Sequence, residues 1–223
     1  MRNVADQANP PVPAQRQELT TWTAAELRRF LDYVSGDRLV GAYTLAATTG
    51  LRRGEVLGLR WRDVDLDAAW VRVVQTLVTV NYKVIVSTPK TNRGRRSVAL
   101  DPTTVAALRA HRVRQAEERL ALGIGAAPDD ALVFAEPDGA LLHPGHFSDR
   151  FDRLVKAAEV PRIRLHDLRH THATLALQAG VHPKVVSERL GHSTIAITLD
   201  TYSHAIPAME EEAAAKVARL VFG

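Results

Sequence analysis

The chain has 223 residues, 46% of them hydrophobic, and contains no cysteine. A chain of this length can bury a large core, and the lack of cysteine excludes disulfides, thiolate-bound zinc and a cysteine nucleophile. Lysine and arginine number 29 against 25 aspartate and glutamate, a mild bias toward polyanionic partners. There is neither a leader-like apolar segment nor a run of about 18 apolar residues. We therefore expect a soluble, cytoplasmic protein with no membrane partner.

The first residues differ in composition from the rest of the chain. Residues 1–20 are polar and rich in proline, which predicts a flexible tail or a linker remnant before a domain spanning 21–223. Thr23 and Glu26 have capping-box spacing, so a helix is predicted over 21–34. Two more helices are predicted. The first spans 37–50 and ends at Gly50, and the second spans 53–61.

The pattern then changes to β-branched residues. Three strands are predicted over 69–80, 83–87 and 95–100, forming an antiparallel meander whose second turn lies near Lys90. Helices return after Asp101, and the predicted segments are 103–123, 144–160, 166–180, 183–191 and 207–222. The expected fold class is α+β, mainly α-helical with one small three-stranded antiparallel sheet.

Basic residues gather in the predicted hairpin. Between Lys83 and Arg96 the sequence "KVIVSTPKTNRGRR" carries five basic residues and no acidic one. Such a cluster is typical of a DNA-binding surface, although lysines and arginines that keep a strand edge soluble would look the same.

The segment "TTGLRRGEVLGLRW" places an arginine directly after a glycine-terminated helix. The turn leaves the Arg52 guanidinium free to lie at a surface. Glu55 lies one helical turn further on and can pair with Arg52 or Arg53, which would fix the direction of that side chain.

The segment "RLHDLRHTHATLALQAG" presents a histidine and an arginine on one helical face. His166 and Arg169 are three residues apart, and together they suit a phosphate, because arginine offers two parallel donors and histidine exchanges a proton near neutral pH. His166 and His170 also have the spacing of helical zinc ligands, but the glutamate of that motif is missing and an arginine in the cluster would repel a dication. We expect no metal and no cofactor.

The segment "LGHSTIAITLDTYSH" contains the third concentration of reactive side chains. Gly191 is predicted to end a helix and to leave His192 at a turn facing a cleft. Tyr202 is either a core aromatic or a group that acts on a substrate. Paired arginines supply positive charge around phosphate oxygens without a metal, and a tyrosine can then act as the nucleophile.

The ordered set "TGLRRGE", "PKTNRGRR", "HDLRHTHAT" and "LGHSTIAITLDTY" resembles the catalytic domain of the tyrosine recombinases, the phage integrase family. The resemblance covers nearly the whole chain after the first twenty or so residues. It implies the fold of DNA breaking and rejoining enzymes, double-stranded DNA as partner, and a metal-free reaction through a 3′-phosphotyrosyl intermediate.

The resemblance also implies a role for each matched residue. Arg52 and Arg169 would clamp the non-bridging oxygens of the scissile phosphate, and His192 would be a further donor to it. His166 would accept a proton or a hydrogen bond, and Lys90 would protonate the departing 5′-hydroxyl. Tyr202 would be the nucleophile. Glu55 would support Arg52, and the remaining arginines of the basic segment would bind DNA: Arg93, Arg95 and Arg96. His170 fits helix packing or phosphate contact, and packing is expected.

Family members usually carry a separate core-binding domain before the catalytic one, and the resemblance finds no match to it here. We therefore expect weak binding to duplex DNA, because fewer phosphates are contacted. The C-terminal helix has Ala213, Val217, Leu220 and Val221 available for an apolar stripe that packs on its own domain or on a neighbour. We expect a monomer for the isolated domain and a tetramer in synapsis. The alternatives are a catalytically silent DNA-binding regulator and a nicking-closing activity like that of type IB topoisomerases.

Overall fold

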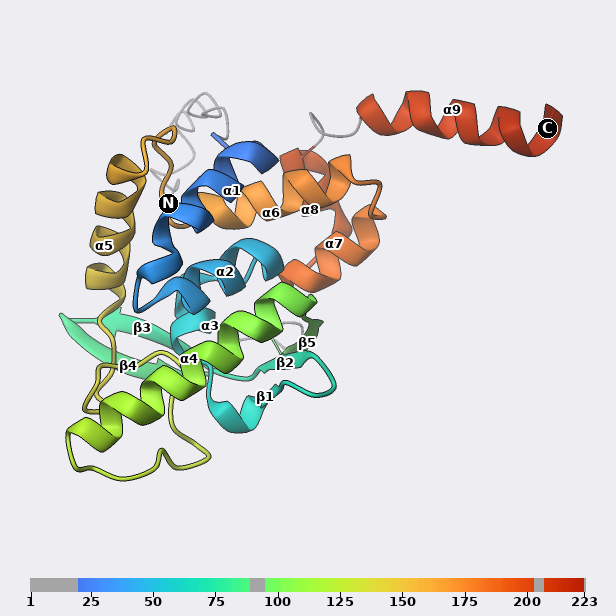
Figure 1. Cartoon of the computed structure of the whole chain (residues 1–223). Helices are drawn as coiled ribbons and strands as arrows, with labels where there is room; N and C mark the ends of the chain where they lie inside the picture. The colour runs from blue at the N-terminus through green and yellow to red at the C-terminus, as the bar shows by residue number, and fades with distance from the viewer. Residues whose placement is uncertain (1–19, 89–94, 203–206, 223) are drawn as a thin grey trace, which may run out of the picture.

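A computed structural model describes residues 20–88, 95–202 and 207–222 of the chain. Helices dominate these residues, and small antiparallel sheets lie along one side of them (Figure 1). The expected α+β class is confirmed. None of the described helices is long and apolar enough to cross a membrane.

The α-helices follow the predicted segments closely. They are α1 (Ala24–Tyr33), α2 (Val40–Thr49), α3 (Arg53–Leu57), α4 (Pro102–Ala121), α5 (Pro144–Ala157), α6 (Asp167–Gln178), α7 (Pro183–Leu190), α8 (Ile195–Tyr202) and α9 (Pro207–Phe222). A short 3₁₀ helix, η2 (Val34–Gly36), continues α1, and a second, η3 (Trp61–Asp63), precedes β1. The predicted capping box of Thr23 and Glu26 is present at the start of α1.

The strands are arranged differently from the predicted meander. They are β1 (Val64–Asp65), β2 (Trp70–Val73), β3 (Thr76–Val80), β4 (Lys83–Ser87) and β5 (Arg96–Ala99). Among the described residues they form a three-stranded sheet in the order β1-β2-β5 and a separate β3-β4 hairpin, all antiparallel. The predicted strand over 69–80 is therefore two strands in two sheets, and β5 pairs with β2 and not with β4.

Two glycines and a glutamine explain the break between β2 and β3. Gln75 donates its side-chain amide to the carbonyl of Gly58 at 2.8 Å, which ties the break to the end of α3. A Cβ on Gly54 would collide with the Leu77 carbonyl oxygen and the Thr76 hydroxyl, and one on Gly58 would lie 3.0 Å from the Thr76 Cα. The absence of a Cβ at Gly54 and Gly58 thus lets β3 pack directly against α3 and its C-terminal end.

The core surrounds α2. This helix is apolar on all sides and buried along almost its whole length, as expected of a helix enclosed by other elements, and it contacts both α4 and α6. On one side of it, an aromatic cluster joins Phe30, Tyr43, Phe147 and Phe151, with Tyr43 and Phe147 stacked at 5.1 Å. The well-packed core holds α2, α3 and α6 rigidly, and the candidate site lies where these helices meet.

The C-terminal helix α9 projects away from the rest of the molecule in Figure 1. Its last turns expose apolar side chains, with Val217 60%, Leu220 87% and Phe222 88% exposed. Val217 and Leu220 belong to the predicted apolar stripe, and the other described residues leave both side chains largely exposed.

Candidate active site

Arg52 begins α3 in an extended conformation and is fixed by Glu55. Gly50 ends α2 with a left-handed backbone, at φ 67°. Glu55 accepts the backbone N–H of Arg52 at 2.8 Å and its guanidinium Nη1 at 3.0 Å. The Arg52 side chain remains 44% exposed. Of the two partners predicted for Glu55, the structure selects Arg52, while Arg53 donates to the Ser148 hydroxyl.

A second arginine holds the other side of Glu55. Arg96 donates Nη1 and Nη2 to the two carboxylate oxygens at 3.1 and 2.9 Å, and its Nε donates to the carbonyl of Arg189 at 2.6 Å. Both side chains of this pair are buried, 8% and 6% exposed. Burial alone would raise the pKa of Glu55, but the hydrogen bonds and charges of Arg96 and Arg52 lower it. Arg96 therefore links α3 to the end of α7, whereas its neighbour Arg95 is exposed.

Arg169 lies in the first turn of α6 and is only 4% exposed. Its Nη1 donates to the carbonyl of Gly50 at 2.8 Å, but its Nη2 is buried and finds no hydrogen-bond partner among the residues that the structure describes. Burial, followed by the nearby charge of Arg52, lowers the pKa of Arg169 to about 9. The guanidinium is thus charged at neutral pH and carries a buried donor without a described acceptor. Burying such a donor is energetically costly unless a bound anion accepts its hydrogen bond.

Tyr202 is 0% exposed, and its phenol oxygen lies 2.8 Å from Nδ1 of His170. Burial raises the pKa of Tyr202 to about 12, although the charge of Arg169 opposes the shift. The ring that contacts the phenol is His170, and not the predicted proton acceptor His166, whose ring meets His170 edge to face at 5.1 Å. Tyr202 is therefore packed in the protein and at the same time lies within electrostatic range of Arg169.

His192 follows the left-handed Gly191, at φ 68°, as predicted. Its Nδ1 lies 2.8 Å from the hydroxyl of Thr198, which is 0% exposed. Burial and then the charges of Arg169 and Arg52 lower the pKa of His192 to about 4. Burial, Arg169 and Arg52 also contribute to the lowered pKa of His166. Both rings are neutral at pH 7, and both lie within range of the two arginines.

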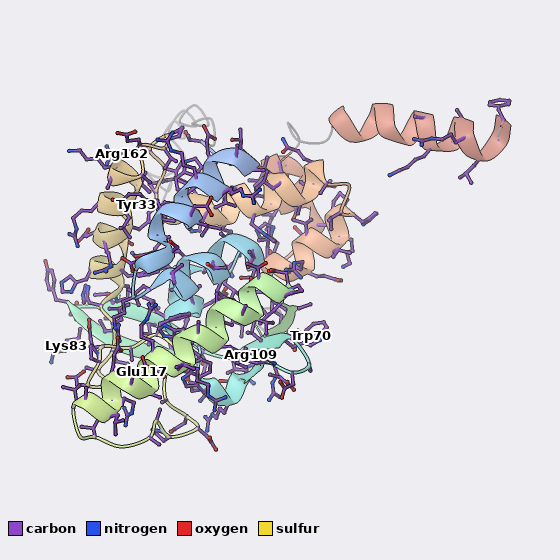
Figure 2. The ribbon with its side chains drawn as sticks, in the orientation of Figure 1. Tyr33, Trp70, Lys83, Arg109, Glu117 and Arg162 are labelled. Atoms are coloured by element: carbon purple, nitrogen blue, oxygen red, sulfur yellow. The ribbon has the colours of Figure 1, made fainter. Side chains whose placement is uncertain are left out.

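A basic cleft of about 440 Å³ opens beside these residues. It is lined by Arg95, Arg96 and His192, and by Lys184, which pairs with Glu188 at 3.2 Å. A larger groove of about 890 Å³ lies elsewhere, between α4 and the β1-β2-β5 sheet, and contains none of the predicted site residues. Trp70 and Arg109 mark this groove in Figure 2.

The structure thus brings together most of the residues singled out in the sequence: Arg52, Glu55, Arg96, His166, Arg169, His192 and Tyr202. Lys90 and Arg93 lie outside the described residues. Within the described ranges, no three His, Cys, Asp or Glu side chains gather in a way that would hold a metal ion. Excess positive charge, neutral imidazoles and a buried phenol define a site for an oxyanion such as a phosphate group.

Comparison with known proteins agrees with this class of site. The sequence model of the phage integrase family matches residues 21–209. A tyrosine recombinase XerC-like protein of Caldanaerobacter subterraneus subsp. tengcongensis is 34% identical over 207 residues, covering 88% of this chain and 53% of the relative. The ICEBs1 integrase of Bacillus subtilis is 31% identical over 209 residues, covering 92% and 56%.

A solved structure shares the fold. The Tn1549 transposon integrase, in complex with a circular intermediate DNA, is 26% identical with a TM-score of 0.75, covering 94% of this chain and 68% of that one. This chain belongs to the phage integrase family. It spans about half the length of the two curated relatives.

Proposed function

We propose that this chain is the catalytic domain, over 21–223, of a site-specific DNA recombinase of the tyrosine type, which cleaves and rejoins DNA strands through a 3′-phosphotyrosyl link. The observation that carries the proposal is the buried Nη2 of Arg169, which no described residue accepts and which lies within electrostatic range of Arg52. Two guanidinium groups within electrostatic range of each other, one exposed and one with a buried donor that no described residue accepts, match the non-bridging oxygens of a phosphodiester.

The proposed reaction uses each group in turn. The phenol oxygen of Tyr202 attacks the phosphorus, the bond to the 5′-oxygen breaks, and a proton must leave the phenol while another reaches the 5′-oxygen. Arg52, Arg169 and His192 stabilise the charge on the non-bridging oxygens. The family resemblance assigns the second proton to Lys90.

His170 is in position to receive the proton from the phenol, since its Nδ1 lies 2.8 Å from the phenol oxygen. Burial, followed by the charge of His166, lowers the pKa of His170 to about 4. A bound phosphate would raise this pKa, because a nearby negative charge favours the protonated ring. We propose that His166 donates or accepts a hydrogen bond at the same phosphate.

Double-stranded DNA is the proposed partner, and we expect the chain to meet it in the cytoplasm. The exposed cleft residues Arg95 and Lys184 support contact with the backbone next to the cleaved phosphate. We propose that copies of the chain assemble on DNA and that the exposed residues of α9 pack against a neighbouring copy.

A nicked duplex that loses a short strand after cleavage traps the covalent complex and tests the proposal. The wild-type chain is expected to form a protein–DNA adduct that survives denaturation, and Tyr202→Phe, which keeps the ring, is expected to form none. An adduct in the Phe variant would show that Tyr202 is not the nucleophile. Supercoiled plasmid relaxed without recombinant products would favour the nicking-closing alternative, and no adduct would favour the silent regulator.

A further inference from the structure

The helix that carries Tyr202 is held by two matching hydrogen bonds on one face. Thr198 and Tyr202 lie one turn apart on α8 and are both 0% exposed. The Thr198 hydroxyl meets Nδ1 of His192, and the Tyr202 hydroxyl meets Nδ1 of His170, each at 2.8 Å. One surface of α8 therefore contacts both the histidine that faces the cleft and the histidine beside the phenol.

The environment of Thr198 decides which way its hydrogen bond runs. A neutral imidazole has one N–H, so either the hydroxyl donates to Nδ1 or Nδ1 donates to the hydroxyl. In the second case the hydroxyl hydrogen needs another acceptor. Thr48 and Thr49 find one in the carbonyl one turn back, but Thr198 makes no other hydrogen bond to any described residue. Because a buried donor without an acceptor is costly, the hydroxyl donates and the His192 proton lies on Nε2.

The position of His192 gives this proton a direction. His192 lines the basic cleft, whereas Thr198 does not. Since Nδ1 is taken up by Thr198, we infer that Nε2, the other ring nitrogen, is the one available to the cleft. A neutral ring with its proton on Nε2 is a donor toward an anion bound there, and the other tautomer would present a lone pair that repels the same anion.

We propose that Thr198 is a positioning residue whose hydroxyl holds His192 in the tautomer that donates from Nε2 to the bound phosphate, and that it does so only while α8 is docked. The second half follows from the shared helix, because a displaced α8 removes Tyr202 and Thr198 together. A chain without its nucleophile in place then also lacks a fixed donor at His192. The phosphate in this statement rests on the proposed function, but the tautomer does not.

The tautomer is measured directly by long-range ¹H–¹⁵N NMR correlations of the histidine rings in the full chain at pH 7 without DNA. His192→Gln identifies the His192 signals. The wild-type chain and Thr198→Ser, which keeps the hydroxyl, are expected to carry the proton on Nε2. Thr198→Val, which has the same shape but no hydroxyl, is expected to show a mixture of tautomers. A wild-type ring protonated on Nδ1, or an unchanged tautomer in Thr198→Val, would overturn the proposal.

The effect on chemistry is measured as the single-turnover rate of adduct formation on saturating nicked duplex. Thr198→Val is expected to slow this rate about tenfold, the effect of one lost hydrogen bond in the transition state, while Thr198→Ser restores it. DNA affinity is expected to change less than about threefold, because both arginines remain. Equal rates in the wild type and Thr198→Val contradict the proposal. If no chain forms an adduct, the proposed function fails, and the NMR result still decides the role of Thr198.

Discussion

Replacing Arg96 by methionine tests whether this arginine is a buried link or a DNA contact. The substitution keeps much of the side-chain volume but removes both hydrogen bonds to Glu55 and the one to the Arg189 carbonyl. It leaves a buried carboxylate, whose remaining partners are the N–H and guanidinium of Arg52. Glu55 is thus only partly compensated in the variant.

The structure sets the size of the effect. Removing one partner of a buried ion pair typically costs about 3–5 kcal/mol. Because Arg52 keeps its two hydrogen bonds to Glu55, the free energy of unfolding is expected to fall by an amount at the lower end of this range, about 3 kcal/mol. The same change in Arg95, which is exposed, is expected to cost less than about 0.5 kcal/mol.

Urea unfolding of the wild type, Arg96→Met and Arg95→Met measures both values, and equal slopes against urea show that the unfolding transitions are comparable. Adding Glu55→Gln to Arg96→Met is expected to cost less than the sum of the single changes, because the uncompensated carboxylate is gone. A loss below about 1 kcal/mol in Arg96→Met would refute the assignment of Arg96 as a structural link.

Three further predictions concern other parts of the chain. Burial, followed by the charge of Arg189, lowers the pKa of His172 from 6.5 to about 4. Between these pH values His172 is protonated in the unfolded state but not in the folded state, so the free energy of unfolding falls as pH decreases. His172→Leu is expected to make the urea midpoint less dependent on pH in this window. An unchanged dependence would contradict the shift in the pKa of His172. Gly54→Ala is expected to lower the free energy of unfolding by about 1–3 kcal/mol, because the added Cβ meets the β3 backbone. Gly36→Ala, whose Cβ meets nothing within 4 Å, is the neutral control in the same urea assay. Equal losses in the two variants would exclude the close contact at Gly54. Light scattering without DNA is expected to give the mass of one chain at low protein concentration. Leu220→Glu is expected to abolish any rise in mass with concentration. A rise that persists in the variant would show that the exposed stripe of α9 is not the surface through which copies associate.

Local patterns predicted the parts of the site that depend on neighbours in sequence. Glycine-terminated helices put Arg52 and His192 at turns, as the left-handed Gly50 and Gly191 show. The spacing of Glu55 to Arg52 became a hydrogen-bonded pair. Helix bounds were predictable for the same reason, since caps and periodicity are local.

Contacts between distant residues could not be predicted in this way. In the sequence, Arg95 and Arg96 are equivalent members of a basic segment, and contacts such as the pairing of Arg96 with Glu55, 41 residues away, separate them in the structure. The contact of His170 with Tyr202 spans 32 residues, and adjacency to Arg169 was its one local signal. The strand prediction was wrong because the pairing of β2 with β5 passes over the whole β3-β4 hairpin.

The structure shows the packed state of Tyr202, while its role as a reactive group belongs to the proposed function. The ring is fully buried, and its hydroxyl is hydrogen-bonded to His170, which lies within electrostatic range of Arg169. Thr198 had a similar local signal, since it precedes Tyr202 by one helical turn. Nothing in the sequence alone connects it to His192.

In the proposed reaction, Tyr202 becomes covalently bonded to DNA. The most direct test is mass spectrometry of the trapped adduct after trypsin and nuclease digestion. Cleavage after Arg189 and Lys216 yields a peptide over 190–216, in which Tyr202 is the single tyrosine. The expected product is a nucleotide joined through its 3′-phosphate to Tyr202 in this peptide. A nucleotide on any other residue, or one joined through a 5′-phosphate, would contradict it.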